Sequence, residues 1–481
     1  MEYPSNVIAA FALSFVLAGC SMAPVVAEPD AVENLPSEFD GEEYMATGSL
    51  DNVPTLHWWN GYGDHVLNAI VDTALVANLD LHIAAARVLE VQQAHRITRS
   101  AQFPGIQAGA RGDKQDIPAN TGATGSFAGS IPGFPDRFET TTYSASLSLA
   151  YELDIWGRAR ANSKAALSNW NASRADFIAI RMGIISEVIS TYFEIRDVQS
   201  QIALMTEQKE LLHDRVEITD QRYDRGLGTS FELYAIRQSF DDLRAQLPLV
   251  HALEYDAISR LSVLLGKPMS HLETMLGTSV DNKSVMPELP AGLPSELVQV
   301  RPDVMAASAR MEAARQMIGV RRAEQFPSFA LTASGGTQSR TLSNLVETSQ
   351  KFWMLGGSLT APVFASGARK AAVKAAWAQY EQAALSYEKA VLTAFRDVSS
   401  ALVMYAGEQE RSGAARSSLA AATASADLMS KRYTRGVGDY ASLVDAKLNE
   451  IRARTSVSSA QRADAMARLS LYRAVGGVWV D

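Results

Sequence analysis

Residues that could carry out chemistry are sparse in this sequence of 481 residues. The single cysteine, Cys20, excludes an internal disulfide and a cysteine-based metal site. The seven histidines are scattered singly, which is more typical of surface or core positions than of metal ligands. No Walker A pattern, H-E-x-x-H motif, nucleophile elbow or dinucleotide fingerprint occurs. The sequence therefore predicts a protein that is not an enzyme and that binds no cofactor or metal.

The charge balance bears on partners. The formal net charge is −9, the pI is near 5.4, and the chain has no basic block. Nucleic acid is therefore not an expected partner. With 47% hydrophobic residues, a chain of this length can bury large cores.

Cys20 ends an apolar run that is too short to cross a membrane but suits the core of a secretory signal. The run closes as Leu17-Ala18-Gly19-Cys20, which resembles the bacterial lipoprotein box. That resemblance implies that residues 1–19 are a signal peptide and that Cys20 is acylated. One departure is that residues 1–6 contain Glu2 and no Lys or Arg. Residues 20–60 are acidic and lack periodicity, so they are expected to form an acylated N-terminal tether.

The chain contains an internal duplication. Arg222–Gly228 reads R-Y-D-R-G-L-G, and Arg432–Gly438, 210 residues later, reads R-Y-T-R-G-V-G. Upstream, Gln102-Phe103-Pro104 matches Gln325-Phe326-Pro327 at an offset of 223. We therefore predict two repeats, residues 61–266 and 301–477, and a C-terminal tail at 478–481. The equatorial linker between the repeats, residues 267–300, is Pro-rich and is expected to be irregular.

Each repeat is expected to contain two strands. Residues 143–155 alternate strictly between apolar and polar side chains, which indicates an amphipathic strand. Its length exceeds the usual ~5–6 residues of a soluble strand and suits a tilted membrane crossing, although half of a soluble sandwich is an alternative. The predicted strands cover about 103–113, 141–155, 326–338 and 352–364.

Long helices follow the strands. Residues 157–225 and 367–435 contain no proline, and their apolar residues step by three and four, as in helices that pack on helices. We also expect one helix from Asp64 to Ala101, a helix over 301–324, and return helices over 231–265 and 440–475.

Four amphipathic strands cannot lie in lipid alone, because an open sheet leaves edge N–H and C=O groups without partners. The edges must be closed by other copies of the chain, and a closed barrel with polar residues inside would hold water. The fold class predicted is therefore an α+β membrane protein that forms a conduit.

Several motifs together resemble the TolC superfamily, and more narrowly the OprM/NodT-like outer-membrane lipoproteins of resistance-nodulation-division (RND) efflux systems. The motifs are Trp58-Trp59, Tyr151 to Arg158 (Y-E-L-D-I-W-G-R), Arg301 to Val304 (R-P-D-V), Phe326-Pro327-Ser328, both R-Y-x-R-G turns and Gly476 to Trp479 (G-G-V-W). The resemblance implies a homotrimer with a twelve-stranded β-barrel and a twelve-helix periplasmic α-barrel. It also implies the outer membrane of a Gram-negative bacterium, with a periplasmic adaptor and an inner-membrane RND pump as partners.

The resemblance assigns roles to two groups of residues. The turn residues would lie at the periplasmic tip and contact the adaptor, unless they only cap and turn helices; they are Arg222, Tyr223, Gly226, Arg432, Tyr433 and Gly436. Asp445 and Ala441 align with a periplasmic gate, where three copies of Asp445 would form a carboxylate ring. Larger apolar residues are common in the family at Ala441, which predicts a looser constriction. Alternatively, Asp445 only solvates a helix face.

The function predicted is a passive trans-periplasmic exit duct for drugs or other small molecules in a tripartite efflux pump. One alternative with the same fold is the outer-membrane duct of a type I secretion system. Another, of a different class, is a soluble periplasmic coiled-coil scaffold with a β-sandwich cap. The apolar positions of residues 143–155 distinguish the duct from the scaffold. A scaffold would bury them in protein, whereas a pore would turn them toward lipid.

Overall fold

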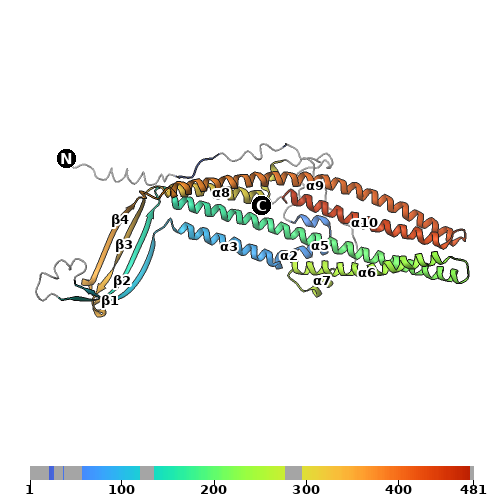
Figure 1. The fold of residues 1–481 in the computed structure, drawn as a ribbon, viewed down its shortest axis with the longest axis horizontal. Helices are drawn as coiled ribbons and strands as arrows, with labels where there is room; N and C mark the ends of the chain where they lie inside the picture. Colours follow the sequence, from blue (N-terminus) through green and yellow to red (C-terminus); the bar gives the residue numbers. More distant parts are fainter. Residues whose placement is uncertain (1–20, 27–35, 37–56, 120–134, 277–294, 477–481) are drawn as a thin grey trace. The chain divides into compact units, whose positions relative to one another are not determined.

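The computed structural model describes residues 21–26, 36, 57–119, 135–276 and 295–476 (Figure 1). Cys20, the tail 478–481 and most of the expected tether lie outside this part of the chain. A short helical turn, η3 (Trp58–Tyr62), comes first. It is followed in chain order by α2 (His65–Ala77), α3 (Leu79–Ser100), β1 (Gly105–Pro118), β2 (Arg137–Leu153), α5 (Arg158–Asp224), α6 (Ser230–Leu264), α7 (Met269–Leu276), η5 (Ser295–Val300), α8 (Pro302–Ala323), β3 (Ser328–Ser339), β4 (Lys351–Thr360), α9 (Ala368–Thr434) and α10 (Tyr440–Ala474).

The duplication is visible in the helices. The helices α3 and α8 have 22 residues each, and their ends are offset by 223. The helices α5 and α9 have 67 residues each, α6 and α10 have 35 each, and both pairs are offset by 210. The predicted protomer, with four strands and long helices duplicated within one chain, is thus confirmed.

Two predictions about connecting segments are wrong. The helix expected from Asp64 to Ala101 is broken at Asn78, whose extended backbone (ψ 126°) ends α2. The Asn78 side chain accepts a hydrogen bond from the Leu81 amide (3.0 Å), which caps the new helix α3. The linker 267–300 was expected to be irregular, yet it contains α7, which buries Leu272 and Leu276 in the core.

The four strands form one antiparallel sheet in the order β1-β2-β3-β4 (Figure 1). Relative to the predicted ranges, β1 extends five residues further and β4 ends at Thr360, four residues earlier. The register places apolar residues side by side on one face, as in the row Ile106, Leu149, Ala333 and Leu355. The opposite face carries polar rows such as Gln107, Ser148 and Ser334, although Met354 of β4 ends that row.

The chain divides into two compact units that do not coincide with the repeats. The sheet unit comprises Met1–Ala27, Glu90–Asn171 and Ala309–Ala384, and the core unit comprises Glu28–Leu89, Ala172–Ser308 and Leu385–Asp481. Each unit therefore takes residues from both repeats. The helices α5 and α9 each contribute residues to both units.

The core unit is organised around the apolar seams predicted on the long helices. Ile185, Val188 and Tyr192 of α5 and Val391 and Val398 of α9 are each at most 2% exposed. Residues before α2 complete this core, because the Trp58 ring stacks on Tyr472 of α10 at 5.3 Å and Trp59 is fully buried. Burial of such aromatic residues contributes a large apolar area to the core.

Over the described residues, no single helix is both long and apolar enough to cross a membrane. The helices α2 and α3, which are bent by 42° at the break between them, could do so as a pair by length and composition only.

Candidate functional site

The two turns that carry the R-Y-x-R-G motif have the same geometry. In the first, the Gly226 amide donates to the Tyr223 carbonyl and the Leu227 amide to the Arg222 carbonyl, both at 2.8 Å. In the second, the equivalent distances from Gly436 and Val437 are 2.9 and 3.0 Å. This is a Schellman motif, in which glycine adopts a left-handed conformation. Gly226 (φ +73°) and Gly436 (φ +72°) both do so, and no atom lies near their missing Cβ, so backbone conformation alone requires glycine.

The side chains at the two turns differ. The first turn exposes Leu227 (67%), Phe231 (82%) and Tyr234 (65%). In the second turn, Val437 is exposed, but Ala441 takes the position equivalent to Phe231. The ring of Tyr433 instead packs against Tyr440 at 5.5 Å, and burial raises the pKa of Tyr440, with the Asp214 carboxylate adding to the effect. The first turn thus exposes more apolar side-chain surface than the second.

Asp445 lies one helical turn beyond Ala441 on α10 and is 58% exposed. Its carboxylate is paired with the guanidinium of Arg215 on α5. Sequence reasoning missed Arg215, because 230 residues separate it from its partner. At the offset of 210, the equivalent positions are Ser425 on α9 and Ala235 on α6, which carry no charge. This ion pair therefore joins α5 of the first repeat to α10 of the second, and it has no counterpart between α9 and α6.

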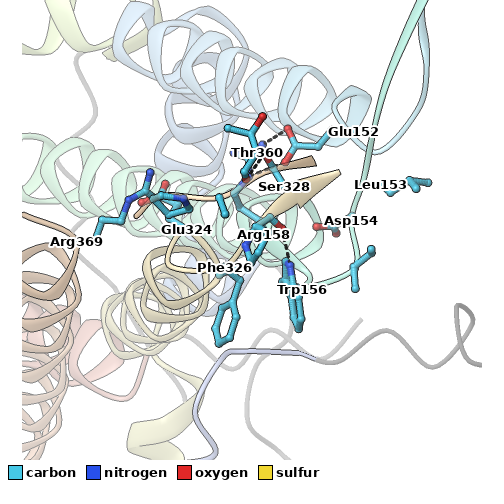
Figure 2. A pocket seen from close by; sticks show the side chains of 15 residues that line it. Glu152, Leu153, Asp154, Trp156, Arg158, Glu324, Phe326, Ser328, Thr360 and Arg369 are labelled. Atoms are coloured by element: carbon cyan, nitrogen blue, oxygen red, sulfur yellow. Dashed lines mark hydrogen bonds and ion pairs between the residues drawn. The ribbon is translucent and has the colours of Figure 1, made fainter. Parts of the chain in front are cut away.

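The Y-E-L-D-I-W-G-R motif forms a joint between strand and helix inside the sheet unit. The Trp156 ring nitrogen donates to the Pro327 carbonyl at 2.8 Å. The Trp156 ring also stacks on Phe326, with 4.7 Å between the ring centroids (Figure 2). Arg158 binds both oxygens of Glu152 (2.8 and 3.2 Å), closing one wall of a cavity of about 300 Å³. Asp154 accepts from the amides of residues 159 and 160, both at 2.9 Å, and so caps α5. Motif residues from both repeats therefore fix how β2 leads into α5 and how α8 leads into β3.

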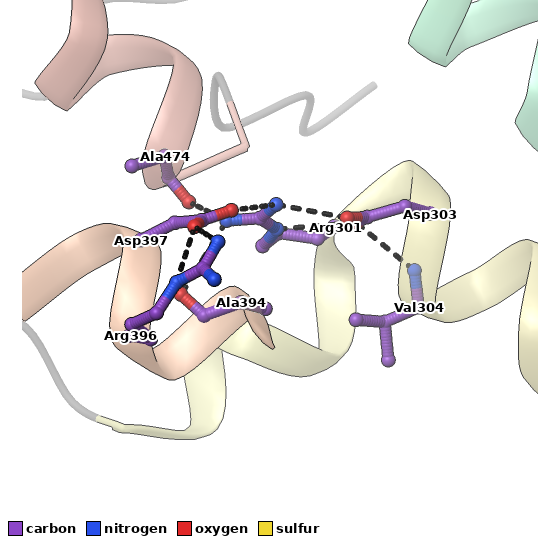
Figure 3. A network of polar contacts seen from close by, with 7 residues as sticks. All are labelled: Arg301, Asp303, Val304, Ala394, Arg396, Asp397 and Ala474. Carbon is purple, nitrogen blue, oxygen red and sulfur yellow. Dashed lines mark hydrogen bonds and ion pairs between the residues drawn. The ribbon is translucent and has the colours of Figure 1, made fainter. Parts of the chain in front are cut away.

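The R-P-D-V motif forms a buried clamp in the core unit. The Arg301 side chain is 10% exposed and donates to the Ala474 carbonyl at the end of α10 (2.8 Å), to both oxygens of Asp303, and to Asp397 of α9 (3.4 Å) (Figure 3). Burial would raise the pKa of Asp303, but hydrogen bonds and charge from Arg301 outweigh it and lower that pKa. The cation is thus held between two carboxylates and a helix C-terminus, where positive charge is favoured.

Asn78 performs the equivalent task in the first repeat. It lies 223 residues before Arg301, is 2% exposed, and donates from its amide nitrogen to the Leu264 carbonyl at 2.8 Å. Leu264 ends α6 as Ala474 ends α10. The same join is therefore made by a neutral side chain in one repeat and by a charged one in the other.

Within the described ranges, no group of three or more His, Cys, Asp or Glu side chains is arranged to hold a metal ion. Cys20, the predicted acylation site, lies outside those ranges.

Comparison with known proteins identifies the family. The family model for outer membrane efflux proteins matches residues 70–267 and 293–477. The chain belongs to the outer membrane efflux protein family. The toluene efflux pump outer membrane protein TtgC of Pseudomonas putida is 28% identical over 97% of this chain and 94% of its own length. The pyoverdine export outer membrane protein OpmQ of Pseudomonas aeruginosa is 27% identical, over 96% and 95%. The open-state structure of the MtrE outer membrane channel of Neisseria gonorrhoeae is 26% identical with a TM-score of 0.80, covering 95% of this chain and 98% of that one.

Family membership confirms the predicted class. This outer membrane efflux protein is a TolC-like component of the outer membrane and is not an enzyme. The sheet agrees with that class rather than with a scaffold, because the apolar residues Leu147 (59%), Trp353 (82%) and Leu355 (73%) are exposed in the chain. A sandwich cap would bury them against a second sheet.

Proposed function

We propose that three copies of this outer membrane efflux protein close into a passive duct for small molecules, with Cys20 acylated and the tips docked on a periplasmic adaptor of an RND pump. The observation that carries the proposal is the four-stranded sheet with one apolar face. Transmembrane barrels need at least about eight strands and closed edges, so one copy is insufficient. The number three follows from the resemblance to TolC-like channels.

The tip residues support adaptor contact. Arg222, Tyr223, Arg432 and Tyr433 are all exposed beside the glycine turns, and Arg and Tyr are favoured interface residues. The Schellman geometry also means that Gly226 and Gly436 serve as helix stops. Contact and capping are therefore compatible, with the arginines and tyrosines supplying the contact.

Asp445 supports a gate through its partner. An ion pair with Arg215 ties α10 to α5, and releasing it would remove this link while the pair of Arg454 with Glu207, further along the same two helices, remains. We propose that the pair holds the periplasmic end narrow, with Ala441 leaving the constriction looser than a larger apolar residue would. The compounds named for the relatives, toluene and pyoverdine, differ widely in polarity. A duct that selects little among small molecules is consistent with that range.

Mass measurement and conductance together test the proposal. The full chain, extracted in mild detergent, is expected to have the mass of three acylated copies and to conduct ions in planar bilayers. Deleting its gene should increase drug susceptibility, and re-expression should restore resistance. A stable monomer that still conducts ions would contradict the proposal.

A further inference from the structure

The described segment that follows Cys20, residues 21–26, lies against α8 inside the sheet unit. The Arg315 guanidinium donates to the Pro24 carbonyl at 2.7 Å, and Pro24 is buried. The Arg322 guanidinium donates to the Met22 carbonyl at 3.5 Å. Both contacts are made to the backbone, so they hold the path of the segment rather than any particular side chain.

Gly319 lies between the two arginines on the same helical face, since positions i, i+4 and i+7 align on a helix. A Cβ at this position would lie 2.7 Å from the Ala23 nitrogen and 2.9 Å from its Cα. Any larger residue would therefore displace the segment. A glycine inside a helix reduces stability by about 1 kcal/mol relative to alanine, so its presence calls for a packing reason.

The two arginines are oriented by other partners. Glu312 accepts from Arg315 at 2.6 and 2.8 Å and from the Gln316 amide at 2.7 Å. Burial would raise the pKa of Glu312, but these hydrogen bonds and the charges of Arg315 and Lys164 lower it, which keeps the carboxylate ionised. Arg322 lies over the Trp377 ring of α9, with its guanidinium carbon 5.5 Å from the ring centre. The donors are thus preorganised for the segment.

Of these features, the equivalent face of α3 keeps only one arginine and the counterpart of Gln316, which is Gln93. At the offset of 223, Gln92 replaces Arg315, Arg96 replaces Gly319, and Arg99 matches Arg322. Arg96 and Arg99 are exposed. The duplication therefore supplies a matched surface that cannot accept the same segment.

We propose that Arg315, Gly319 and Arg322 form a docking site on α8 for the chain's own N-terminal segment, residues 21–26. The site lies near the end of α8 that leads into β3, so it fixes the level at which an acyl chain on Cys20 enters lipid. Only this consequence rests on the proposed acylation; the docking itself does not.

Limited proteolysis of the full chain in detergent tests the docking site. An elastase-type protease, which cleaves after small apolar residues, should cut after Val25 slowly while the segment is docked, because cleavage follows the population of the open form. Mass spectrometry would count only cuts within residues 21–26. We expect Gly319→Val to accelerate them at least tenfold, and Arg96→Val on α3 to leave them unchanged.

Two further forms keep the test decisive. Arg315→Ala with Arg322→Ala removes the donors without adding volume and should also accelerate cleavage, with the native mass checked to show that the fold persists. A form with a general export signal and Cys20→Ser should stay protected. Unchanged cleavage in Gly319→Val, or cleavage of the Cys20→Ser form at the Gly319→Val rate, would overturn the proposal. Neither result depends on conductance, so failure of the docking site and failure of the duct can be told apart.

Discussion

The two repeats share a backbone but differ in the side chains that join their helices. Asn78 and Arg301 occupy equivalent positions and both donate to the last carbonyl of a return helix. Only Arg301 also binds two carboxylates. The comparison teaches that duplication preserved the geometry of the joins, while each copy acquired its own chemistry at them.

Glycines show how far the shared backbone extends. Of the seven glycines with positive φ in the described residues, six form three pairs at the offset of 210, namely Gly157 with Gly367, Gly226 with Gly436, and Gly266 with Gly476. Each pair marks the same start or end of a helix in both repeats. Conformation at the helix ends was thus retained where side chains diverged.

The largest expected effect is a difference in stability between variants of Arg301 and variants of Asn78, the two residues that bind the end of a return helix. Arg301→Ala should lower the free energy of unfolding by on the order of 3 kcal/mol, because it leaves Asp303 without a cation, Asp397 with Arg396 alone, and the Ala474 carbonyl unpaired. Asn78→Ala should lower it by only about 2 kcal/mol, since it leaves the Leu264 carbonyl and the Leu81 amide unpaired but no charge without its partner. Urea unfolding of the purified protein, followed by circular dichroism, measures both. Arg301→Lys, which keeps the charge but not the forked geometry, should fall between them. Equal losses from the two alanine variants would show that the charge adds nothing.

The next effect concerns the ion pair of Arg215 on α5 with Asp445 on α10, which has no equivalent between α9 and α6. Arg215→Ala and Asp445→Ala should each raise ion conductance in planar bilayers, by up to about fivefold per released pair, because a partly exposed pair contributes at most about 1 kcal/mol. Ser425→Ala, at the position equivalent to Arg215, is the matched control and should change nothing. An increase in only one of the two charge-removing variants would show that the pair itself is not what narrows the channel.

A third prediction compares the tips. Arg432→Glu should weaken crosslinking to the adaptor by on the order of tenfold, the size of an interface hot spot. At the first tip, Phe231→Ala should weaken crosslinking to the adaptor more than Arg222→Glu does, because that turn exposes apolar surface. Arg416→Glu, an exposed position on α9 away from the turn, serves as the control. Unchanged crosslinking and drug resistance in Arg432→Glu would rule out adaptor contact at this turn.

The smallest expected effect is a pH dependence of one tip. Asp439 caps α10 by accepting from the backbone amide and the hydroxyl of Ser442, both at 2.8 Å, and these contacts lower the pKa of Asp439. The cap therefore stabilises the tip above the ordinary aspartate pKa of about 3.9 and is lost as pH falls through the lowered value. Thr229, the equivalent cap of α6, does not titrate.

A nitroxide label at Val437 should become more mobile as the pH falls below the ordinary aspartate pKa, whereas one at Leu227 should not. Asp439→Thr should remove the change at Val437, and Thr229→Asp should introduce it at Leu227. Equal responses at both labels would indicate general loosening of the protein rather than titration of the cap.

Much of the fold could be predicted because local patterns dominate it. Period-two alternation revealed β2, absence of proline revealed α5 and α9, and the repeated turns revealed the duplication. The break at Asn78 was missed, although Asn is a good helix cap and the offset of 223 maps it to Arg301, which precedes Pro302. The helix α7 was missed because its burial depends on contacts with a core that no local pattern describes.

The site was less predictable, since its contacts join distant residues. The partnership of Arg215 with Asp445 and the docking of Pro24 on Arg315 both require knowledge of which helices and segments pack together. Gly319 could have indicated the docking site from the sequence alone, because it is a glycine in the interior of a helix and its counterpart in the first repeat is Arg96.

The way the compact units are built has a consequence for synthesis and export. Pairing of β2 with β3 joins residues about 200 positions apart, such as Tyr143 with Ser339, and both units need segments from the second half of the chain. A half-exported polypeptide therefore contains no complete unit, and in the periplasm its strands β1 and β2 can pair only with each other until β3 arrives. Long-range pairing of this kind is slow and prone to aggregation, so this chain should depend on holding chaperones until its last helix has been delivered.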